Sequence, residues 1–516
     1  MRLTLGEIAR VLDCRSVPGL SGETAALRPG GASVDSRRTR PGHLFFCLPG
    51  ERVDGHDFAP VAVRAGAVAV IGTRDPFAGA SPVPVFVVPD SVRALGMLAR
   101  AHRDGMRGKV IGITGSAGKT SLKEALATVL ARAGETEKNP LNLNNQIGLP
   151  LSMLNSSETA AFWVMEAGIS KPHDMDELGG ILHPDVAVVL NVCDVHAEFL
   201  GDRGVAHYKA KLLDYLAPGG TAVVSADYPD LLAEASARPG KTVTFSGHAG
   251  GAPFSAEAVA PITTDAGGDE GGGATNPAGE GRGCFRVVTP GGTFTVTAPF
   301  QGAIGAENTA AVTAAASSLG LDAALIPSLV ADGLGRMALP AQRGGVEKYG
   351  VHAIVDGSYN ANPLAMARTL DNAAELAKAR NLSLVLALGE MGELGEEAER
   401  RHEELGKHAA ALDPALIFWK GDRAGAVRKG LLAGGYAGTL IRADGADEFM
   451  EGFRQARLPG ALVMFKASRS KRMDLWADAF RAAYGPRASQ SAQSGQSAQS
   501  AQFGQPAQSG QEKGEH

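Results

Sequence analysis

The chain has 516 residues, enough for about three domains of roughly 150 residues each, so it is not a single small binding module. Its 50 Lys and Arg residues face 55 Asp and Glu residues, and the net charge of −5 provides no overall positive field to hold nucleic acid. The 67 glycines and 28 prolines, with only 5% aromatic residues, predict many tight turns between short strands and helices.

The four cysteines, at positions 14, 47, 193 and 284, lie far apart and lack the close pairs of a zinc site or a disulfide framework. The first residues contain no apolar run typical of a secretory signal, and no stretch reaches 18 apolar residues. We therefore expect a cytoplasmic protein with no membrane insertion.

The residue pattern predicts an α/β protein with three domains. The first domain, 1–107, has little regular alternation and is expected to be a smaller α/β domain. The second, 108–338, alternates buried strands with helices; strands are predicted at 109–114, 161–166, 185–191 and 221–225, which indicates a mostly parallel sheet. After the first of these strands, apolar residues from Leu122 to Ala133 follow helical spacing, and Gly134 ends the helix.

A second alternating series predicts a doubly wound, Rossmann-like domain over 339–486. Its strands are expected near 351–356, 382–388, 415–419, 439–441 and 461–466.

Two segments have a composition typical of disorder. The segment 263–283 is rich in glycine and polar residues and is predicted to be a surface insertion between strands. The tail, 487–516, has glutamine at every third position from Gln490 to Gln511, so no packed fold is expected there. A tether that binds a partner is the alternative interpretation of the tail.

A phosphate-binding motif follows the strand at 109–114, directly before the predicted helix. Backbone N–H groups in such a loop turn toward an anion, the lysine adds a positive charge, and the threonine hydroxyl can bind Mg²⁺. The strict pattern has glycine where this chain has Ile113, so the motif is a variant. It predicts binding of a nucleoside triphosphate by the residues Gly115, Ser116, Ala117, Gly118, Lys119, Thr120 and Ser121.

Polar residues also follow the next predicted strands. Glu166 ends one strand and can hold the Mg²⁺ of a nucleotide, because ligands bind at the carboxyl ends of parallel strands. Asn191 ends the next strand and is predicted to place a further ligand at the same edge. His196 follows it and could bind a second cation. Taken alone, Lys211 would be one more surface lysine.

The order of these motifs resembles the Mur ligase family of peptidoglycan synthesis. The resemblance rests on the motifs at 115–120 and 165–168, on Asn191 with His196, and on the following lysine-containing helix. C-terminal motifs at 356–363, 389–395 and 466–469, and N-terminal motifs at 33–37, 41–46 and 54–56, extend it over about residues 30 to 475. It implies the family's three domains: one that binds a UDP-sugar, a central ATP-binding domain and a C-terminal ligase domain.

The C-terminal motifs resemble those of the branch that joins D-alanyl-D-alanine to UDP-N-acetylmuramoyl-tripeptide. The implied reaction uses ATP to phosphorylate the tripeptide carboxylate, and the amine of the dipeptide then attacks the acyl phosphate. ATP and two Mg²⁺ ions are the implied cofactors, and a monomer is expected. The alternatives are a sister ligase or a folylpolyglutamate synthetase-like ligase that adds one amino acid, and a nucleotide-binding regulator without ligase activity.

The resemblance also implies roles for single residues. Thr120 and Glu166 correspond to ligands of the nucleotide Mg²⁺, while His196 and a carbamylated lysine serve the second ion. That lysine is matched to Lys211, with Lys209 as the alternative because the spacing from His196 is slightly long.

Further matches are spread over the whole chain. Arg343 matches the arginine that reaches the γ-phosphate, Asn308 matches the adenine-contacting asparagine, and Asp356 is expected to contact the nucleotide. The predicted contacts to the substrates are Ser36, Arg37, Asn144, Asn145, Lys466 and Arg469.

Four departures from the family pattern concern nucleotide or C-terminal contacts. Gly357 stands where the family has a second aspartate, and Ile304 and Gly305 replace a histidine and an asparagine. Glu390 replaces an aspartate and Ala467 a glycine. These changes bear on ATP affinity rather than on the class of reaction.

Overall fold

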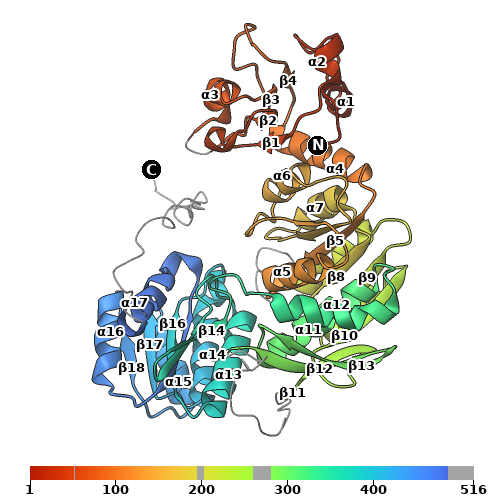
Figure 1. Cartoon of the computed structure of the whole chain (residues 1–516). Coiled ribbons are helices and arrows are strands. Elements are labelled where there is room, and N and C mark those ends of the chain that lie inside the picture. The colour runs from red at the N-terminus through yellow and green to blue at the C-terminus, as the bar shows by residue number, and fades with distance from the viewer. Residues whose placement is uncertain (51–52, 194–202, 260–280, 486–516) are drawn as a thin grey trace, which may run out of the picture.

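Three β-sheets, each built from a successive stretch of the chain, organise the molecule (Figure 1). The computed structural model describes residues 1–50, 53–193, 203–259 and 281–485. The predicted α/β architecture with three parts is confirmed.

The first sheet has four parallel strands in chain order. Its strands are β1 (Gly31–Ser33), β2 (His43–Phe46), β3 (Ala69–Gly72) and β4 (Val85–Val87). The helices of this part are α1 (Leu5–Val11), α2 (Gly22–Ala26), α3 (Ala59–Arg64) and α4 (Ser91–Asp104), with the 3₁₀ turns η1 (Ser36–Arg38) and η2 (Gly55–Phe58).

The second sheet has nine strands in the order β13-β12-β11-β10-β9-β8-β5-β7-β6. They are β5 (Lys109–Thr114), β6 (Thr136–Lys138), β7 (Phe162–Glu166), β8 (Val186–Val189), β9 (Thr221–Ser225), β10 (Lys241–Ser246), β11 (Phe254–Val259), β12 (Gly283–Thr289) and β13 (Gly292–Ala298). The described helices of this part are α5 (Lys119–Leu130), α6 (Gly148–Leu154), α7 (Asp174–Leu182), α9 (Gly204–Ala210), α10 (Pro229–Ser236), α11 (Gly302–Ser317) and α12 (Ile326–Arg336), with η3 (Lys211–Tyr215) and η4 (Ala323–Leu325).

The four strands predicted for this part correspond to β5, β7, β8 and β9, which pair in parallel. The sequence pattern missed the antiparallel end of the sheet, where β12 pairs with β11 and β13. Strand β13 is half exposed and rich in threonine, so it lacks the continuous apolar run on which the prediction rested. Most of the predicted insertion 263–283 lies outside the described residues, between β11 and β12.

The third sheet has six strands in the order β14-β15-β19-β16-β17-β18, and only β14 is antiparallel among them. They are β14 (Gly345–Tyr349), β15 (His352–Asp356), β16 (Ser383–Gly389), β17 (Leu416–Lys420), β18 (Leu440–Arg442) and β19 (Ala461–Lys466). The helices are α13 (Pro363–Ala379), α14 (Ala398–Ala411), α15 (Ala424–Ala433), α16 (Ala446–Gln455) and α17 (Asp474–Tyr484), with η5 (Gly395–Glu397) and η6 (Arg469–Lys471).

Successive residues of this sheet point to opposite faces, and both faces are buried. Val355 belongs to the apolar cluster under α13, α14 and α15, while its neighbour Ile354 belongs to the cluster under α16 and α17. Two-sided burial explains why the predicted strands are nearly continuous apolar runs. The tail 487–516 lies outside the described residues.

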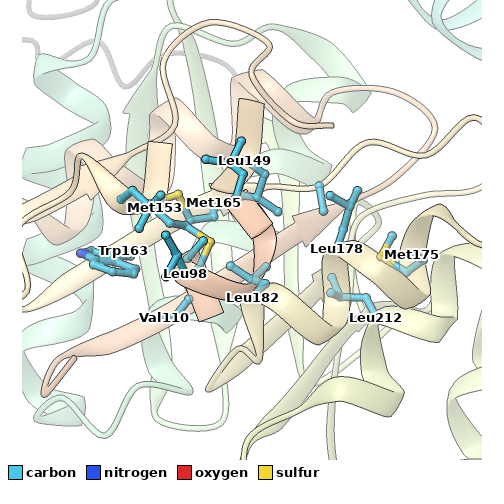
Figure 2. Close-up of a cluster of buried hydrophobic side chains, with 14 of the residues drawn as sticks. Leu98, Val110, Leu149, Met153, Trp163, Met165, Met175, Leu178, Leu182 and Leu212 are labelled. Carbon is cyan, nitrogen blue, oxygen red and sulfur yellow. The ribbon is translucent and has the colours of Figure 1, made fainter. Parts of the chain in front are cut away.

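One apolar core joins the first part of the chain to the central sheet (Figure 2). Leu98 of α4 packs in the same fully buried cluster as Met153 of α6, Trp163 of β7 and Leu182 of α7. Helix α4 belongs to the range 1–107, yet it covers the central sheet. No helix in the described parts of the chain is both long and apolar enough to cross a membrane.

Adjacent strands bring the predicted nucleotide residues to one edge. In the central sheet β5 lies between β8 and β7, and all three are parallel. Their carboxyl ends therefore meet at the same edge, where ligands bind in open α/β sheets. This edge carries the loop after β5, Glu166 at the end of β7 and Asn191 after β8.

Candidate nucleotide and ligase site

The phosphate loop, defined here as residues 115–120, connects β5 to α5. Gly118 stands before the helix with φ of 78°, a left-handed conformation that glycine adopts without strain. No side chain caps the start of α5, so its first N–H groups are available to an anion. The Lys119 ammonium donates to the carbonyl of Gly115 at 2.8 Å and lies along the loop.

Glu166 is held at the carboxyl end of β7 by contacts on all sides. Its Oε2 accepts from the Thr120 hydroxyl at 2.8 Å and its Oε1 accepts from the Asn144 side chain at 2.7 Å. The Asn139 side chain bonds both the N–H and the carbonyl of Glu166, at 2.9 and 3.0 Å. This buried carboxylate and the Thr120 hydroxyl therefore form a fixed oxygen pair beside the loop.

A second lysine of α5, Lys123, stabilises the segment that contacts Glu166. Lys123 is fully buried, and its ammonium donates to the carbonyls of Asn139 and Leu141 at 2.6 and 2.9 Å. Burial lowers the pKa of Lys123, while Glu166 and Glu124 act in the opposite direction. Lys123 thereby ties the segment that carries Asn144 to the helix of the phosphate loop.

Asn191, which follows β8, contacts the phosphate loop directly. The sequence placed it as a possible metal ligand, but its side-chain carbonyl accepts from the N–H of Ala117 at 2.8 Å. Its backbone carbonyl accepts from the N–H of Ser116 at 3.0 Å. Asn191 therefore shapes the loop.

The loop opens into a cleft of about 300 Å³ between the central and C-terminal parts. The central wall includes the phosphate loop, Glu166 and Asn308, and the opposite wall includes Arg343, Tyr359 and Lys466. The Arg343 guanidinium stacks 3.6 Å from the centre of the Tyr359 ring. Asn362, which caps α13, donates to the carbonyl of Ser116 at 3.2 Å, so the C-terminal part touches the loop directly.

Cationic side chains gather around this cleft and repel one another. Burial lowers the pKa of Lys119, and Arg343 lowers it further although Glu166 opposes the change. Burial and Arg343 also lower the pKa of Lys466 to about 8. Burial and Lys119 lower the pKa of Lys209 to about 7. Such a cluster is suited to an anion with several charges.

The structure separates the predicted site residues into two groups. Those that line the cleft are Ser116, Ala117, Gly118, Lys119, Thr120, Ser121, Asn144, Glu166, Asn308, Arg343 and Lys466. Those that do not line it are Ser36, Arg37, Gly115, Asn145, Lys211, Asp356 and Arg469. His196 lies outside the described residues, and among the described ones no group of three His, Cys, Asp or Glu side chains is placed to hold a metal ion.

Three of the predicted substrate residues make local contacts. Arg37 is largely exposed and forms a two-pronged pair with Asp35, next to Ser36 in η1. The Asn145 side chain accepts from the N–H groups of Ile147 and Gly148 and shapes the turn before α6. Arg469 lies over the ring of Tyr359, 4.9 Å from the ring centre.

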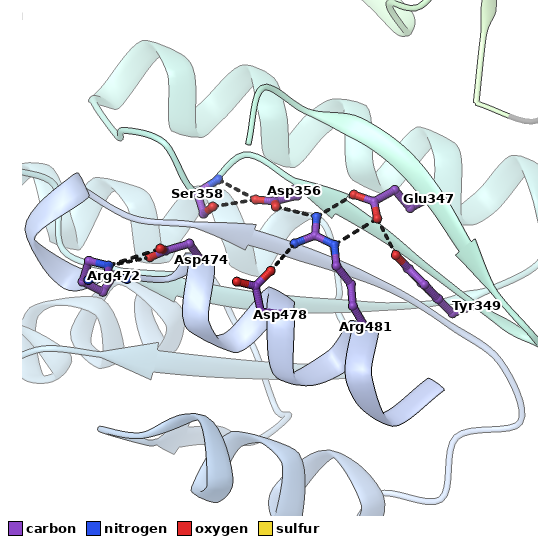
Figure 3. Close-up of polar contacts among 8 residues, drawn as sticks. All are labelled: Glu347, Tyr349, Asp356, Ser358, Arg472, Asp474, Asp478 and Arg481. Carbon is purple, nitrogen blue, oxygen red and sulfur yellow. Dashed lines mark hydrogen bonds and ion pairs between the residues drawn. The ribbon is translucent and has the colours of Figure 1, made fainter. Parts of the chain in front are cut away.

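Asp356, predicted to bind the nucleotide, is not among the residues that line the cleft, and its carboxylate contacts other residues of the C-terminal part (Figure 3). Its carboxylate accepts from Arg481 of α17 at 2.6 Å and from the backbone and hydroxyl of Ser358 at 3.1 and 2.6 Å. Arg481 also pairs with Glu347 of β14. The carboxylate of Asp356 is thus committed to joining β15 to α17.

We expect Arg481→Ala to destabilise the protein by about 3 kcal/mol, because the buried carboxylate of Asp356 would lose its counter-charge. Thermal or denaturant unfolding followed at the C-terminal domain measures the effect. The control is Arg472→Ala, which removes a surface pair with Asp474 and should change stability by less than about 1 kcal/mol. Equal effects of the two changes would contradict the role of Arg481.

The two candidates for the carbamylated lysine lie in different surroundings. Lys211, the first match, forms an ion pair with Asp176, whose other oxygen accepts from Tyr215 at 3.0 Å. Lys209, the alternative, is 3% exposed and has no hydrogen-bond partner among the described residues. Burial is the main cause that lowers the pKa of Lys209, and the positive charge of Lys119 lowers it further.

The departures from the family pattern have local explanations. Ile304 lines the cleft with an apolar surface, and a side chain at Gly305 would meet the Phe285 ring at 2.3 Å, so α11 packs closely there. Glu390 pairs with Lys471 and accepts from the N–H groups of Asp422 and Arg423. Glu390 therefore orders the C-terminal domain outside the cleft.

Asn308 offers an unused acceptor in the cleft wall. Its side-chain N–H group donates to the carbonyl of Ile304 at 2.9 Å, which fixes the orientation of the amide. The opposite atom, Oδ1, is buried and has no hydrogen-bond partner in the described structure. A buried acceptor of this kind requires a donor to offset its loss of hydration.

Three family models match successive parts of the chain. They are described as the Mur ligase family catalytic domain, over residues 31–103, the Mur ligase middle domain, over 113–316, and the Mur ligase glutamate ligase domain, over 335–469.

Individual relatives and structures agree with these models. UDP-N-acetylmuramoyl-tripeptide–D-alanyl-D-alanine ligase of Escherichia coli is 32% identical over 75% of this chain and 81% of its own length. The enzyme of the same name from Mycobacterium bovis is 30% identical over 93% and 98%. The crystal structure of MurF from Acinetobacter baumannii matches with a TM-score of 0.78 and 26% identity over 93% and 99%. That of MurF from Thermotoga maritima in complex with ADP matches with a TM-score of 0.72 and 28% identity over 88% and 97%.

The matched relatives and structures cover up to 93% of the chain, and the phosphate loop, Glu166 and Arg343 meet in one cleft. The chain therefore belongs to the Mur ligase family.

Proposed function

We propose that the chain is an ATP-dependent ligase that joins D-alanyl-D-alanine to UDP-N-acetylmuramoyl-tripeptide, forming ADP and phosphate. This reaction completes the UDP-linked pentapeptide used in peptidoglycan synthesis. The match to the relatives named for this activity covers up to 98% of their length, which supports assignment of the whole reaction to this chain.

The observation that carries the proposal is the cation cluster around the cleft. Lys119, Arg343 and Lys466 come from two different parts of the chain, and the charge of Arg343 lowers the pKa of both lysines. Their mutual repulsion is unfavourable without a ligand and becomes favourable when a triphosphate enters. Asn308 Oδ1, which lies close to Gly118 of the phosphate loop, supplies a buried acceptor in the cleft wall that suits the amino group of adenine.

The reaction brings together two anions, the tripeptide carboxylate and the triphosphate. At 4 Å two unit charges repel by about 4 kcal/mol at an effective dielectric constant of 20. Lys119 offsets this charge from the loop side, and Arg343 does so from the C-terminal side. The carboxylate oxygen attacks the γ-phosphorus and ADP leaves; the dipeptide amine then attacks the acyl carbon, loses a proton, and phosphate leaves.

The oxygen pair formed by Thr120 and Glu166 fits Mg²⁺, which prefers hydroxyl, carboxylate and phosphate oxygens. We propose that these two residues hold the nucleotide-associated ion and that His196 serves a second one. Mg²⁺ bound there supplies positive charge to the phosphate oxygens. Asn144, on the other oxygen of Glu166, orients the carboxylate for this role.

We further propose that Lys209 is the carbamylated residue. An amine must be neutral to attack carbon dioxide, and the nitrogen then forms a bond to carbon and loses a proton. A pKa of about 7 leaves a large neutral fraction at physiological pH, whereas an ordinary lysine is almost entirely charged. Carbamylation would also remove a positive charge from beside Lys119.

The UDP-sugar is expected to contact Ser36 and Arg37 in the N-terminal domain, and the dipeptide is expected near Lys466 and Arg469. The exposed guanidinium of Arg37 suits a pyrophosphate, which accepts two hydrogen bonds from one arginine.

The test is phosphate release by the purified full-length protein with ATP and Mg²⁺. Release should require both UDP-N-acetylmuramoyl-tripeptide and D-alanyl-D-alanine, and mass spectrometry should detect the pentapeptide product. Replacing the dipeptide by single amino acids distinguishes a sister ligase. Release that is unaffected by either substrate would favour a nucleotide-binding regulator and contradict the proposal.

A further inference from the structure

A buried polar cluster joins the C-terminal domain to the strand that supports the phosphate loop. We call it the Glu307 latch; it consists of Glu307 of α11, Arg368 of α13, Tyr228 before α10, and Asn191 after β8. Arg368 donates to the Glu307 carboxylate through one nitrogen and to the Tyr228 hydroxyl through another. The Tyr228 hydroxyl donates to Glu307 Oε1 at 3.3 Å.

The latch continues to the phosphate loop through Asn191. The side-chain N–H group of Asn191 donates to Glu307 Oε2 at 3.4 Å, while the carbonyl on the other side of the same amide accepts from Ala117 at 2.8 Å. Because a carboxamide is planar and its two ends are chemically distinct, a bond at one end fixes the direction of the other. The carboxylate of Glu307 thus orients the group that holds the loop.

Burial makes this arrangement depend on Arg368. The Glu307 side chain is 3% exposed, and a buried carboxylate requires a counter-charge and hydrogen-bond donors. Arg368 supplies both from the C-terminal domain, 61 residues away in sequence. When that domain moves away, Glu307 loses the guanidinium, and the amide of Asn191 loses its fixed partner.

We propose that Glu307 and Arg368 are positioning residues that couple docking of the C-terminal domain to the conformation of the phosphate loop. Docking of α13 orients Glu307, Glu307 orients Asn191, and Asn191 holds the loop in the form that accepts the triphosphate. The direct bond from Asn362 to Ser116 acts at the same loop, so two contacts from the start of α13 converge there. The inference rests on the proposed function only because it takes the ligand to be ATP.

The experiment measures amide hydrogen exchange over residues 113–121 in the unliganded full-length protein, together with binding of ADP and of UDP-N-acetylmuramoyl-tripeptide. Arg368→Ala should increase exchange at the loop about ten-fold and weaken ADP binding about ten-fold, within the usual range of coupling between sites. Binding of the UDP-linked substrate should be unchanged. Arg368→Lys should restore part of both effects.

The matched control is Lys378→Ala, which alters an exposed cation on the same helix and should leave both measurements unchanged. If Arg368→Ala unfolds the protein, the double variant Glu307→Gln with Arg368→Met replaces it. This variant removes both charges and therefore leaves no buried carboxylate without a counter-charge. It should show the same faster exchange.

Unchanged loop exchange in a folded Arg368 variant would overturn the inference. Weaker ADP binding without faster exchange would also overturn it, because Arg368 would then contact the nucleotide directly. Exchange in the unliganded protein does not depend on turnover, so failure of the ligase assay and failure of the latch are distinguishable.

Discussion

Lys119→Ala is expected to lower the ligation rate about a thousand-fold while the fold survives. The magnitude is typical of removing one preorganised group that stabilises charge in a transition state. In the structure the ammonium contacts only the carbonyl of Gly115 among the described residues, and burial and the charge of Arg343 make its presence unfavourable without a ligand. Steady-state ligation and thermal unfolding of the same preparation measure the two effects.

Lys123→Ala provides the comparison, because this lysine lies one turn further along the same helix. It holds the carbonyls of Asn139 and Leu141, so its loss should reduce both stability and activity. Lys138→Ala, which removes a partly exposed cation outside the cleft, should change neither appreciably. Full activity of Lys119→Ala would contradict a phosphate role for this lysine.

Lys209→Ala is expected to lower activity about a hundred-fold, whereas Lys211→Ala should retain most of it. The first change removes the buried amine beside Lys119, and a loss of this size is usual when a group that supports a metal site is removed. The second removes a partly exposed ion pair with Asp176. Short carboxylic acids should restore part of the activity of Lys209→Ala, since they can occupy the space of the carbamate.

The carbamate itself can be detected directly, in addition to the activity assay. Nuclear magnetic resonance of protein equilibrated with isotope-labelled carbon dioxide should detect a carbamate signal in the parent protein and in Lys211→Ala, but none in Lys209→Ala. The signal should grow as the pH rises through about 7, because the neutral amine is the form that reacts. A signal that disappears only in Lys211→Ala would restore the first assignment.

Local sequence determined much of the fold. The apolar runs of β5, β7, β16 and β19 were predicted within a residue or two, because strands buried on both faces need continuous apolar sequence. The phosphate loop was also recognisable, because strand, loop and helix are contiguous and each residue acts within a short segment. Family membership followed from the order of such motifs.

Contacts between distant segments could not be predicted in this way. Asp356 belongs to a motif that suggests nucleotide binding, and the sequence did not show that its carboxylate pairs with Arg481, 125 residues later. The pairing of Glu307 with Arg368 likewise depends on how α13 packs against α11. Neither partner carries a local signal, because ion pairs across domains depend on tertiary packing alone.

Lys209 and Lys211 show most clearly what the sequence determined and what only the tertiary structure decided. The sequence established that a lysine follows His196 at about the required spacing, and it left Lys209 and Lys211 as alternatives. Two positions along a helix differ by roughly 200° in direction, so the two side chains point to nearly opposite sides. Only the packing of α9 and η3 decided that Lys211 reaches Asp176 and that Lys209 is buried.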